Sequence, residues 1–180
     1  MAVGISGFTV PSAPVPVYTA CIGCDTIADI GAGDGYFSIP AAKIVGDSGI
    51  ILALDAYPEA LSDLNAAALA AGLTNIKTIA GEAENSLICR NCADIVLMAN
   101  VLHDFNDPVA ALQNARLALK PDGRLIDLDW KKEKDQPQGP PFNIRFDQEK
   151  ATALLEDAGF IVVSSELVGP FHYILVAKPS

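Results

Sequence analysis

The sequence predicts a doubly wound, Rossmann-like α/β fold, in which a mostly parallel sheet has helices on both faces. Short apolar segments rich in β-branched residues alternate with helical patterns along most of the chain. A glycine-rich turn at residues 31–35 directly follows one such segment and precedes a helical pattern. The last two apolar segments, 161–164 and 172–177, have no helix between them. Their seven-residue connection is too short for a parallel crossover and predicts an antiparallel last strand.

Seven predicted strands follow one another along the chain. They are 26–30, 50–54, 76–79, 93–100, the end of 119–126, 161–164 and 172–177. Between them, helices are predicted at 36–45, 58–71, 108–118 and 147–158. Pro58 and Pro108 suit first helical turns, where the missing N–H costs little. Gly72 and Gly159 suit the position after a helix end, and Asp147 suits an N-cap.

Length and composition are typical of one enzyme-sized domain. The 180 residues predict a single domain over 1–180, with an extended N-terminal arm at 1–20 and a core at 21–180. Proline and glycine in the arm argue against a helix there. Apolar residues make up 51% and charged residues 19%, which suits a parallel sheet buried on both faces.

The charge and hydropathy of the chain argue against several partners. Its net charge of −10 disfavours nucleic acid, because binding phosphates requires a basic surface. We found no apolar run long enough to cross a bilayer and no basic secretory leader, so we expect no membrane and a cytoplasmic protein. A homodimer remains open.

The glycine-rich turn predicts a site for a nucleoside-containing cofactor. Glycines let a ligand approach the main chain, and the following helix points its free N–H groups at the ligand. Asp55 follows the next predicted strand, where a carboxylate can accept both ribose hydroxyls. The dinucleotide spacing G-x-G-x-x-G fails because Tyr36 takes the place of the third glycine. Asp29, just before the turn, would repel a pyrophosphate but suits an ammonium group.

Together these motifs resemble the class I S-adenosylmethionine-dependent methyltransferases, whose first motif reads acid-x-G-x-G-x-G. The chain is most similar to small members related to the ubiquinone and menaquinone C-methyltransferases. The resemblance covers roughly residues 24–178 and includes the segments 81–85, 93–105 and 119–126 in the family's order. It implies a seven-stranded sheet with an antiparallel last strand. It also implies S-adenosylmethionine as cofactor and methyl transfer to a small-molecule acceptor.

The resemblance also implies roles for individual residues. The cofactor-binding residues are expected to be Asp29, Gly31, Gly33, Gly35, Asp55, Glu82, Ala83 and Asn100. Glu82 would meet the exocyclic amine of adenine, the Ala83 main chain would meet a ring nitrogen, and Asn100 would lie beside the methionine portion. The long segment from Trp130 to Arg145 is expected either to line the acceptor pocket or to be disordered.

His103 is the candidate catalytic base. An imidazole with a pKa near 6.5 can remove a proton from a hydroxyl or an acidic carbon at neutral pH. The pair His103-Asp104 resembles the His-Asp dipeptide of some plant-type O-methyltransferases, where the histidine is the base. The alternative is that both residues only cap the next helical turn. His172 lies in the predicted last strand, and we expect it to be structural.

The four cysteines form two C-x-x-C pairs, Cys21/Cys24 and Cys89/Cys92. Each pair precedes a strand, and in the predicted fold those two strands are adjacent. Both pairs would then meet at the sheet edge opposite the cofactor, where four thiolates could hold a structural zinc ion. Disulfides between the two pairs and free thiols are the alternatives.

Two other functions stay open at this point. One is a dinucleotide-dependent oxidoreductase, which would have to tolerate Tyr36 in the glycine motif. The other is a non-catalytic module that keeps the cofactor fold for interaction or regulation. The identity of the acceptor does not follow from the sequence, since one fold can host many chemistries.

Overall fold

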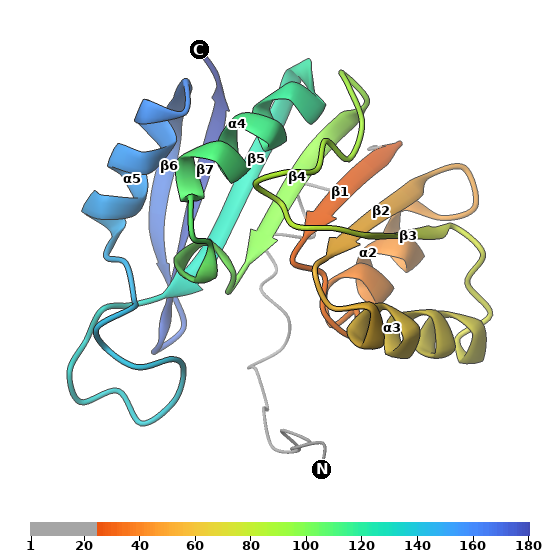
Figure 1. Ribbon diagram of the computed structural model, residues 1–180, viewed down its shortest axis with the longest axis horizontal. Helices are drawn as coiled ribbons and strands as arrows, with labels where there is room; N and C mark the ends of the chain where they lie inside the picture. The colour runs from red at the N-terminus through yellow and green to blue at the C-terminus, as the bar shows by residue number, and fades with distance from the viewer. Residues whose placement is uncertain (1–24) are drawn as a thin grey trace.

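Seven strands form one sheet in the order β3-β2-β1-β4-β5-β7-β6 (Figure 1). This computed structural model describes residues 25–180, so the predicted arm 1–20 and the cysteines at 21 and 24 lie outside the described residues. The strands are β1 Thr26–Ile30, β2 Ile50–Asp55, β3 Ile76–Ala80, β4 Ala93–Ala99, β5 Leu119–Trp130, β6 Phe160–Val168 and β7 His172–Pro179. The predicted seven-stranded, doubly wound sheet is confirmed.

The first five strands are parallel, and their register brings the site loops together. Ile30 of β1 lies opposite Leu54 of β2 on one side and Met98 of β4 on the other. Strands β2 and β3 lie on one side of β1, whereas β4 and β5 lie on its other side. The order in which strands are added to the sheet therefore switches sides between β1 and β4. Open α/β sheets bind ligands at such a switch point, beyond the carboxyl ends of the strands.

The last two strands form the predicted antiparallel hairpin. β7 pairs antiparallel with both β5 and β6, with Asp129 opposite Tyr173 and Trp130 opposite His172. As a result, the end of β5 lies beside the start of β7. This pairing brings residues far apart in sequence into one region near the candidate base.

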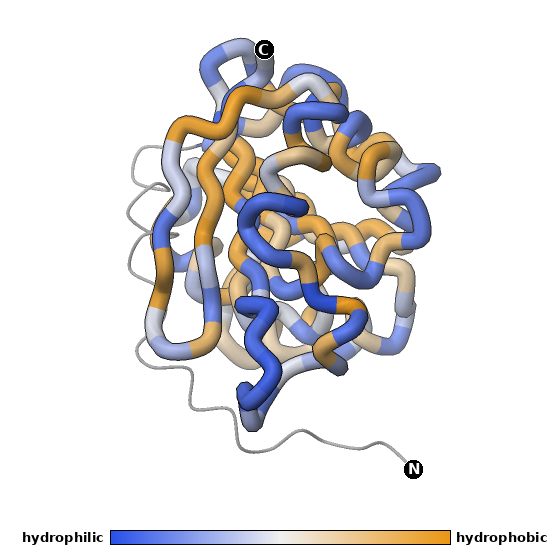
Figure 2. Tube along the Cα trace, turned by 90° about the vertical axis from the view of Figure 1, so that its left-hand side faces the viewer, coloured by the Kyte–Doolittle hydropathy of each residue, from blue (hydrophilic) through white to orange (hydrophobic). Residues whose placement is uncertain are grey.

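Helices cover both faces of the sheet (Figure 1). α2 Ser38–Val45 and α3 Pro58–Ala70 pack on one face, whereas α4 Pro108–Ala118 and α5 Gln148–Asp157 pack on the other. A short 3₁₀ helix, η1 Leu102–Asp104, joins β4 to α4. Figure 2 shows apolar stretches in the interior strands and hydrophilic stretches in many outer loops. No helix within residues 25–180 is both long and apolar enough to cross a membrane.

Element ends differ slightly from the predictions, for local reasons. α2 begins two residues later than expected, at Ser38, after a turn that includes Tyr36. β4 ends at Ala99 because Asn100 adopts a left-handed backbone with φ 57°. The predicted caps are observed: Pro108 begins α4, and the Asp147 carboxylate accepts a hydrogen bond from Lys150 N at 2.8 Å.

Candidate functional site

A cleft of about 570 Å³ lies at the carboxyl ends of the parallel strands. Its walls come from the loops that follow β1, β2, β3 and β4. The residues that line it are Ile30, Gly31, Leu54, Asp55, Ala56, Tyr57, Gly81, Glu82, Ala83, Glu84, Asn100, Val101, Asp104, Phe105 and Asn106. Five of the predicted cofactor residues therefore share one cleft: Gly31, Asp55, Glu82, Ala83 and Asn100.

The glycine-rich turn holds its shape through backbone geometry that favours glycine. Gly31, Gly33 and Gly35 have φ values of 75°, 55° and 91°, in the left-handed region. A side chain at Gly31 would bring its Cβ within 2.5 Å of Val101 Cγ2, whereas the space beside Gly33 is open for 4 Å. The turn is therefore closely packed at Gly31 and open at Gly33.

Asp55 anchors this turn from the end of β2. Its carboxylate accepts a hydrogen bond from Gly33 N at 2.8 Å and another from Tyr57 N at 2.9 Å. Each carboxylate oxygen has more than one lone pair, so Asp55 can also accept hydroxyl groups from a ligand in the cleft. This position suits the predicted contact with ribose.

Asp29 is placed differently from the expectation of a direct ligand contact. It is 2% exposed, is not part of the cleft wall, and accepts a hydrogen bond from Ser38 Oγ at 2.5 Å. Burial raises its pKa to about 6, although the Ser38 hydrogen bond opposes this shift. In the structure, the Asp29 side chain thus links the end of β1 to the start of α2 through Ser38. Its contact with an ammonium group stays a prediction.

Asn100 lines the cleft and has an unused acceptor. Its Oδ1 atom is buried and has no hydrogen-bond partner among the described residues. A buried polar atom of this kind is costly unless a ligand or water satisfies it. An ammonium or hydroxyl donor of a bound cofactor would satisfy it, so this residue fits the expected methionine portion.

The loop after β3 is fixed to α4. The carbonyl oxygens of Ala83 and Glu84 both accept from Asn114 Nδ2 at 2.9 Å. Glu82 is exposed, and its Oε2 accepts from Asn85 Nδ2 at 2.8 Å. The expected adenine contacts of Glu82 and Ala83 therefore lie on a loop that hydrogen bonds within the protein hold to α4.

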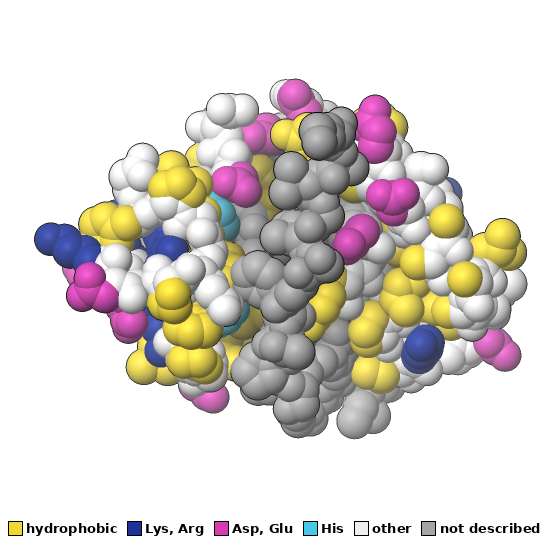
Figure 3. All heavy atoms as spheres, turned by 90° about the horizontal axis from the view of Figure 1, so that it is seen from below, with side chains coloured by type: hydrophobic (Ala, Val, Ile, Leu, Met, Phe, Trp, Pro, Cys, Tyr) yellow, Lys and Arg dark blue, Asp and Glu magenta, His cyan; other side chains and the backbone are white. Residues whose placement is uncertain are grey.

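The cleft is acidic. Four carboxylates line it, those of Asp55, Glu82, Glu84 and Asp104, and no lysine or arginine is among its described lining residues. Such a cleft favours a cationic ligand and disfavours a pyrophosphate. Most Lys and Arg side chains visible on the face seen from below lie at its left, away from the centre (Figure 3).

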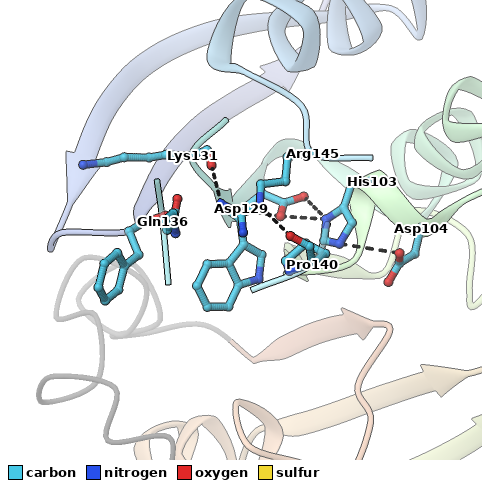
Figure 4. A network of polar contacts seen from close by, with 9 residues as sticks. His103, Asp104, Asp129, Lys131, Gln136, Pro140 and Arg145 are labelled. Atoms are coloured by element: carbon cyan, nitrogen blue, oxygen red, sulfur yellow. Dashed lines mark hydrogen bonds and ion pairs between the residues drawn. The ribbon is translucent and has the colours of Figure 1, made fainter. Parts of the chain in front are cut away.

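The sequence did not reveal the partner of His103. The Nδ1 atom of His103 lies 2.8 Å and 2.9 Å from the two carboxylate oxygens of Asp129, at the end of β5 (Figure 4). His103 is 8% exposed and Asp129 is 1% exposed. Burial lowers the pKa of His103, but the hydrogen bond and charge of Asp129 and the charge of Asp104 outweigh burial and raise it overall.

The capping alternative for His103-Asp104 is wrong. α4 is capped by Asp107, whose carboxylate accepts from Ala110 N at 3.0 Å. The ring of His103 instead points across the sheet end to β5 (Figure 4). With Nδ1 beside Asp129, Nε2 is the ring nitrogen that could act as a general base, and it lies 3.5 Å from Asp104 Oδ1.

A second buried acid, Asp127, lies on the same face of β5. It is fully buried, and neither of its carboxylate oxygens has a partner among the described residues. Burial and the nearby charge of Asp129 raise the pKa of Asp127 well above its usual value. The hydroxyl of Tyr173, on β7, is also buried without a partner. The sequence signal for this cluster was the charged pair Asp127 and Asp129 within an otherwise apolar strand.

Arg145 organises the segment between β5 and α5. This buried guanidinium donates to the carbonyl oxygens of Lys131, Glu133, Gln138 and Pro140 at 2.7–3.5 Å. Trp130 is also buried and stacks on His172 with ring centroids 4.1 Å apart. The segment is therefore ordered around Arg145, and its expected lining of an acceptor pocket stays a prediction.

Cys89 and Cys92 form a disulfide, with Cα atoms 6.1 Å apart. The alternative of disulfides that join one C-x-x-C pair to the other is therefore wrong for these two residues. Their bond links the two cysteines of one pair, at a usual Cα separation. Residues 25–180 contain no group of three or more side chains suited to a metal ion. Cys21 and Cys24 lie outside the described residues, so a four-cysteine zinc site stays a prediction and would require the Cys89–Cys92 bond to be reduced.

Comparisons with known proteins show the family and the fold of this chain. A family model described as a methyltransferase domain matches residues 24–159. A crystal structure of an S-adenosylmethionine-dependent methyltransferase from Aquifex aeolicus is similar, with a TM-score of 0.86 and 27% identity over 93% of this chain and 90% of that one.

Two curated relatives are similar over shorter stretches. A ubiquinone/menaquinone biosynthesis C-methyltransferase from Blochmanniella pennsylvanica is 30% identical over 123 residues, or 63% of this chain. A protein-L-isoaspartate O-methyltransferase from Archaeoglobus fulgidus is 26% identical over 102 residues, or 57% of this chain. The chain spans 44% of the length of each of these relatives.

Proposed function

Because this chain belongs to the methyltransferase-domain family of the class I, S-adenosylmethionine-dependent type, we propose that it transfers a methyl group to a small-molecule acceptor. One observation carries the proposal: a cleft at the switch point of the sheet combines the Asp55 carboxylate with the unpartnered Oδ1 of Asn100. Asp55 would bind the ribose, and Asn100 would accept from the amino group of the methionine portion. When bound, S-adenosylmethionine supplies an electrophilic methyl group on a sulfonium.

The acidity of the cleft supports this cofactor over a dinucleotide. S-adenosylmethionine carries positive charge at the sulfonium and the ammonium, which the carboxylates of Asp55, Glu82, Glu84 and Asp104 would attract. A dinucleotide would place a pyrophosphate near the same carboxylates and would find no arginine or lysine among the described lining residues. The oxidoreductase alternative therefore lacks support from the site.

We further propose that His103 is a general base for the acceptor. Asp129 holds the ring by Nδ1, so Nε2 would take the proton. An acceptor that needs such a base has a proton to lose, as a hydroxyl or an acidic carbon does. The relative from Blochmanniella pennsylvanica is named a C-methyltransferase, which is compatible with a carbon acceptor.

Calorimetric titration with S-adenosylmethionine, S-adenosylhomocysteine and nicotinamide dinucleotides tests the proposal. We expect wild type to bind the first two, and Asp55→Asn to bind them about tenfold to a hundredfold more weakly, the cost of losing a hydrogen bond to a charged group. Asp34→Asn is the matched control, because Asp34 lies in the glycine-rich turn that Asp55 anchors but outside the cleft wall.

Each other outcome has a distinct meaning. Binding only of a nicotinamide cofactor would establish the oxidoreductase alternative instead. Binding of S-adenosylmethionine without turnover of any hydroxyl or acidic-carbon acceptor in a broad panel would favour the non-catalytic module. Thermal unfolding of each variant separates lost binding from lost folding, because Asp55 also holds Gly33 N and Tyr57 N.

A further inference from the structure

His103 lies between two carboxylates that differ in their freedom to move (Figure 4). The side chain of Asp129 is 1% exposed and is fixed by His103 Nδ1 and also by Trp130 N at 2.7 Å. The side chain of Asp104 is 60% exposed, and its Oδ1 lies 3.5 Å from His103 Nε2. A separation of 3.5 Å is longer than a strong charge-assisted hydrogen bond, so the second contact is loose.

Asp104 also belongs to the cleft wall, beside Asn100 and Val101. It is therefore the residue that touches both the proposed cofactor site and the proton-accepting atom of the candidate base. Asp129 is not part of this wall and approaches the ring from the opposite side. An acceptor that enters from the cleft beside Asp104 and delivers its proton to Nε2 would approach the position that Asp104 Oδ1 now takes.

We infer that Asp104 is a displaceable carboxylate cap on His103 Nε2, and that the proton-bearing group of the acceptor takes its place. Asp104 is thus a positioning residue that acts through His103. The inference rests on the proposed function only for the identity of the incoming group. In the reaction, the acceptor oxygen or carbon would give its proton to Nε2 and form its new bond to the methyl carbon. The bond between that carbon and sulfur breaks, and its electrons stay on sulfur.

The charges around His103 explain what such a cap would do. Asp129 on β5 and Asp104 on η1 both favour the charged imidazolium, whereas Arg145, from the segment before α5, opposes it. While Asp104 is in place, the ring is therefore more readily protonated and less available as a base. A neutral acceptor group in place of Asp104 lowers the pKa of His103 and frees its lone pair at the moment when an acceptor is present.

An NMR titration of the imidazole signals tests the coupling without any cofactor or acceptor. The chain has two histidines, so His172→Gln assigns the His103 signal. We expect Asp104→Asn to lower the pKa of His103 by about half a pH unit, as expected for a partly exposed ion pair. Asp107→Asn is the matched control, since it removes a nearby charge while asparagine can still cap α4. A His103 titration in Asp104→Asn identical to that of wild type overturns the inference.

Acylation of His103 by diethyl pyrocarbonate tests whether Asp104 covers Nε2. At a pH where the ring is neutral in every variant, we expect Asp104→Ala to react severalfold faster than wild type and Asp107→Asn to react at the wild-type rate. Equal rates for Asp104→Ala and wild type would overturn the cap. Failure of the proposed function would appear separately, as absence of S-adenosylmethionine binding in calorimetry.

Discussion

The ring of His103 binds through Nδ1 to the carboxylate of Asp129, 26 residues later in the chain, at 2.8 Å. His103 comes from the connection after β4 and Asp129 from the end of β5, and these strands are parallel neighbours. Their contact therefore exists only because the two strand ends meet at the same edge of the sheet. Both side chains of this pair are buried, so removing either one leaves the other as an uncompensated buried polar group.

We expect Asp129→Asn to lower the free energy of unfolding by about 3 kcal/mol, the usual cost of breaking a buried ion pair. The pKa of His103 is raised in the folded state, so the charged pair stabilises most below the unfolded value of about 6.5 and loses this contribution as pH rises through the folded value. Urea unfolding should thus show a larger loss at about pH 5.5 than at about pH 8.5. Equal losses at both pH values would contradict the charged pair.

Asp127→Asn should stabilise the protein, and increasingly so at higher pH. Burial and the charge of Asp129 raise the pKa of this carboxyl in the folded state, whereas the unfolded chain releases the proton above a pKa of about 3.9. Because the pKa of Asp127 is higher in the folded state than in the unfolded state, wild type loses stability as the pH rises from the unfolded pKa toward the folded pKa. The folding equilibrium constant of the variant should therefore gain over wild type as the pH rises from about 4 toward the raised folded pKa, by at most about tenfold per pH unit.

Urea unfolding across that pH range measures the effect of Asp127→Asn. Asp122→Asn is the matched control, because Asp122 lies exposed on the same strand. A ratio between variant and wild type that does not change with pH would mean that Asp127 is ionised in the folded protein.

Gly31→Ala should cost more stability than Gly33→Ala. Both positions have left-handed φ values, 75° and 55°, so each alanine pays about 1–2 kcal/mol of backbone strain. Only at Gly31 does the new Cβ also meet Val101 Cγ2, at 2.5 Å, which adds about 1–3 kcal/mol of overpacking. Chemical denaturation of the two variants compares them directly, and equal losses would show that Val101 moves aside freely.

Arg145→Lys should loosen the segment between β5 and α5. A lysine ammonium cannot reach the four carbonyl oxygens that the guanidinium now binds, and the unpaired carbonyls cost about 2 kcal/mol. Trypsin should then cleave faster after Lys131, Lys132 or Lys134, all within this segment. Arg124→Lys, at an exposed position on β5, is the control and should leave the cleavage rate unchanged. An unchanged rate in Arg145→Lys would contradict the role of the guanidinium.

Several features of the fold could be predicted because their causes are local. The order of strands and helices follows from hydrophobic periodicity. The residues where α4 and α5 begin follow from Pro108 and Asp147. The antiparallel hairpin of β6 and β7 follows from a connection too short for a crossover. The turn at Gly31 and its neighbour Asp55 follow from the spacing of glycines after a buried strand.

Other features depend on where strands from distant parts of the chain come to lie. The sequence predicts Asp29 as a ligand contact, and only the packing of α2 on β1 shows that this side chain is buried and accepts a hydrogen bond from Ser38. The capping interpretation of His103 was plausible from adjacent residues, and only the pairing of β4 with β5 brings Asp129 within reach. The same geometry places Asp104 between the cleft and Nε2.

By itself, the sequence determined the fold class, the glycine turn and the carboxylate that anchors it. It did so because backbone conformation, periodicity and capping act over a few residues. The tertiary structure alone decided which side chains surround His103, how Arg145 orders its segment, and which acids are buried. Those outcomes depend on contacts between residues far apart in the chain, and on the loss of water around them, which no local pattern encodes.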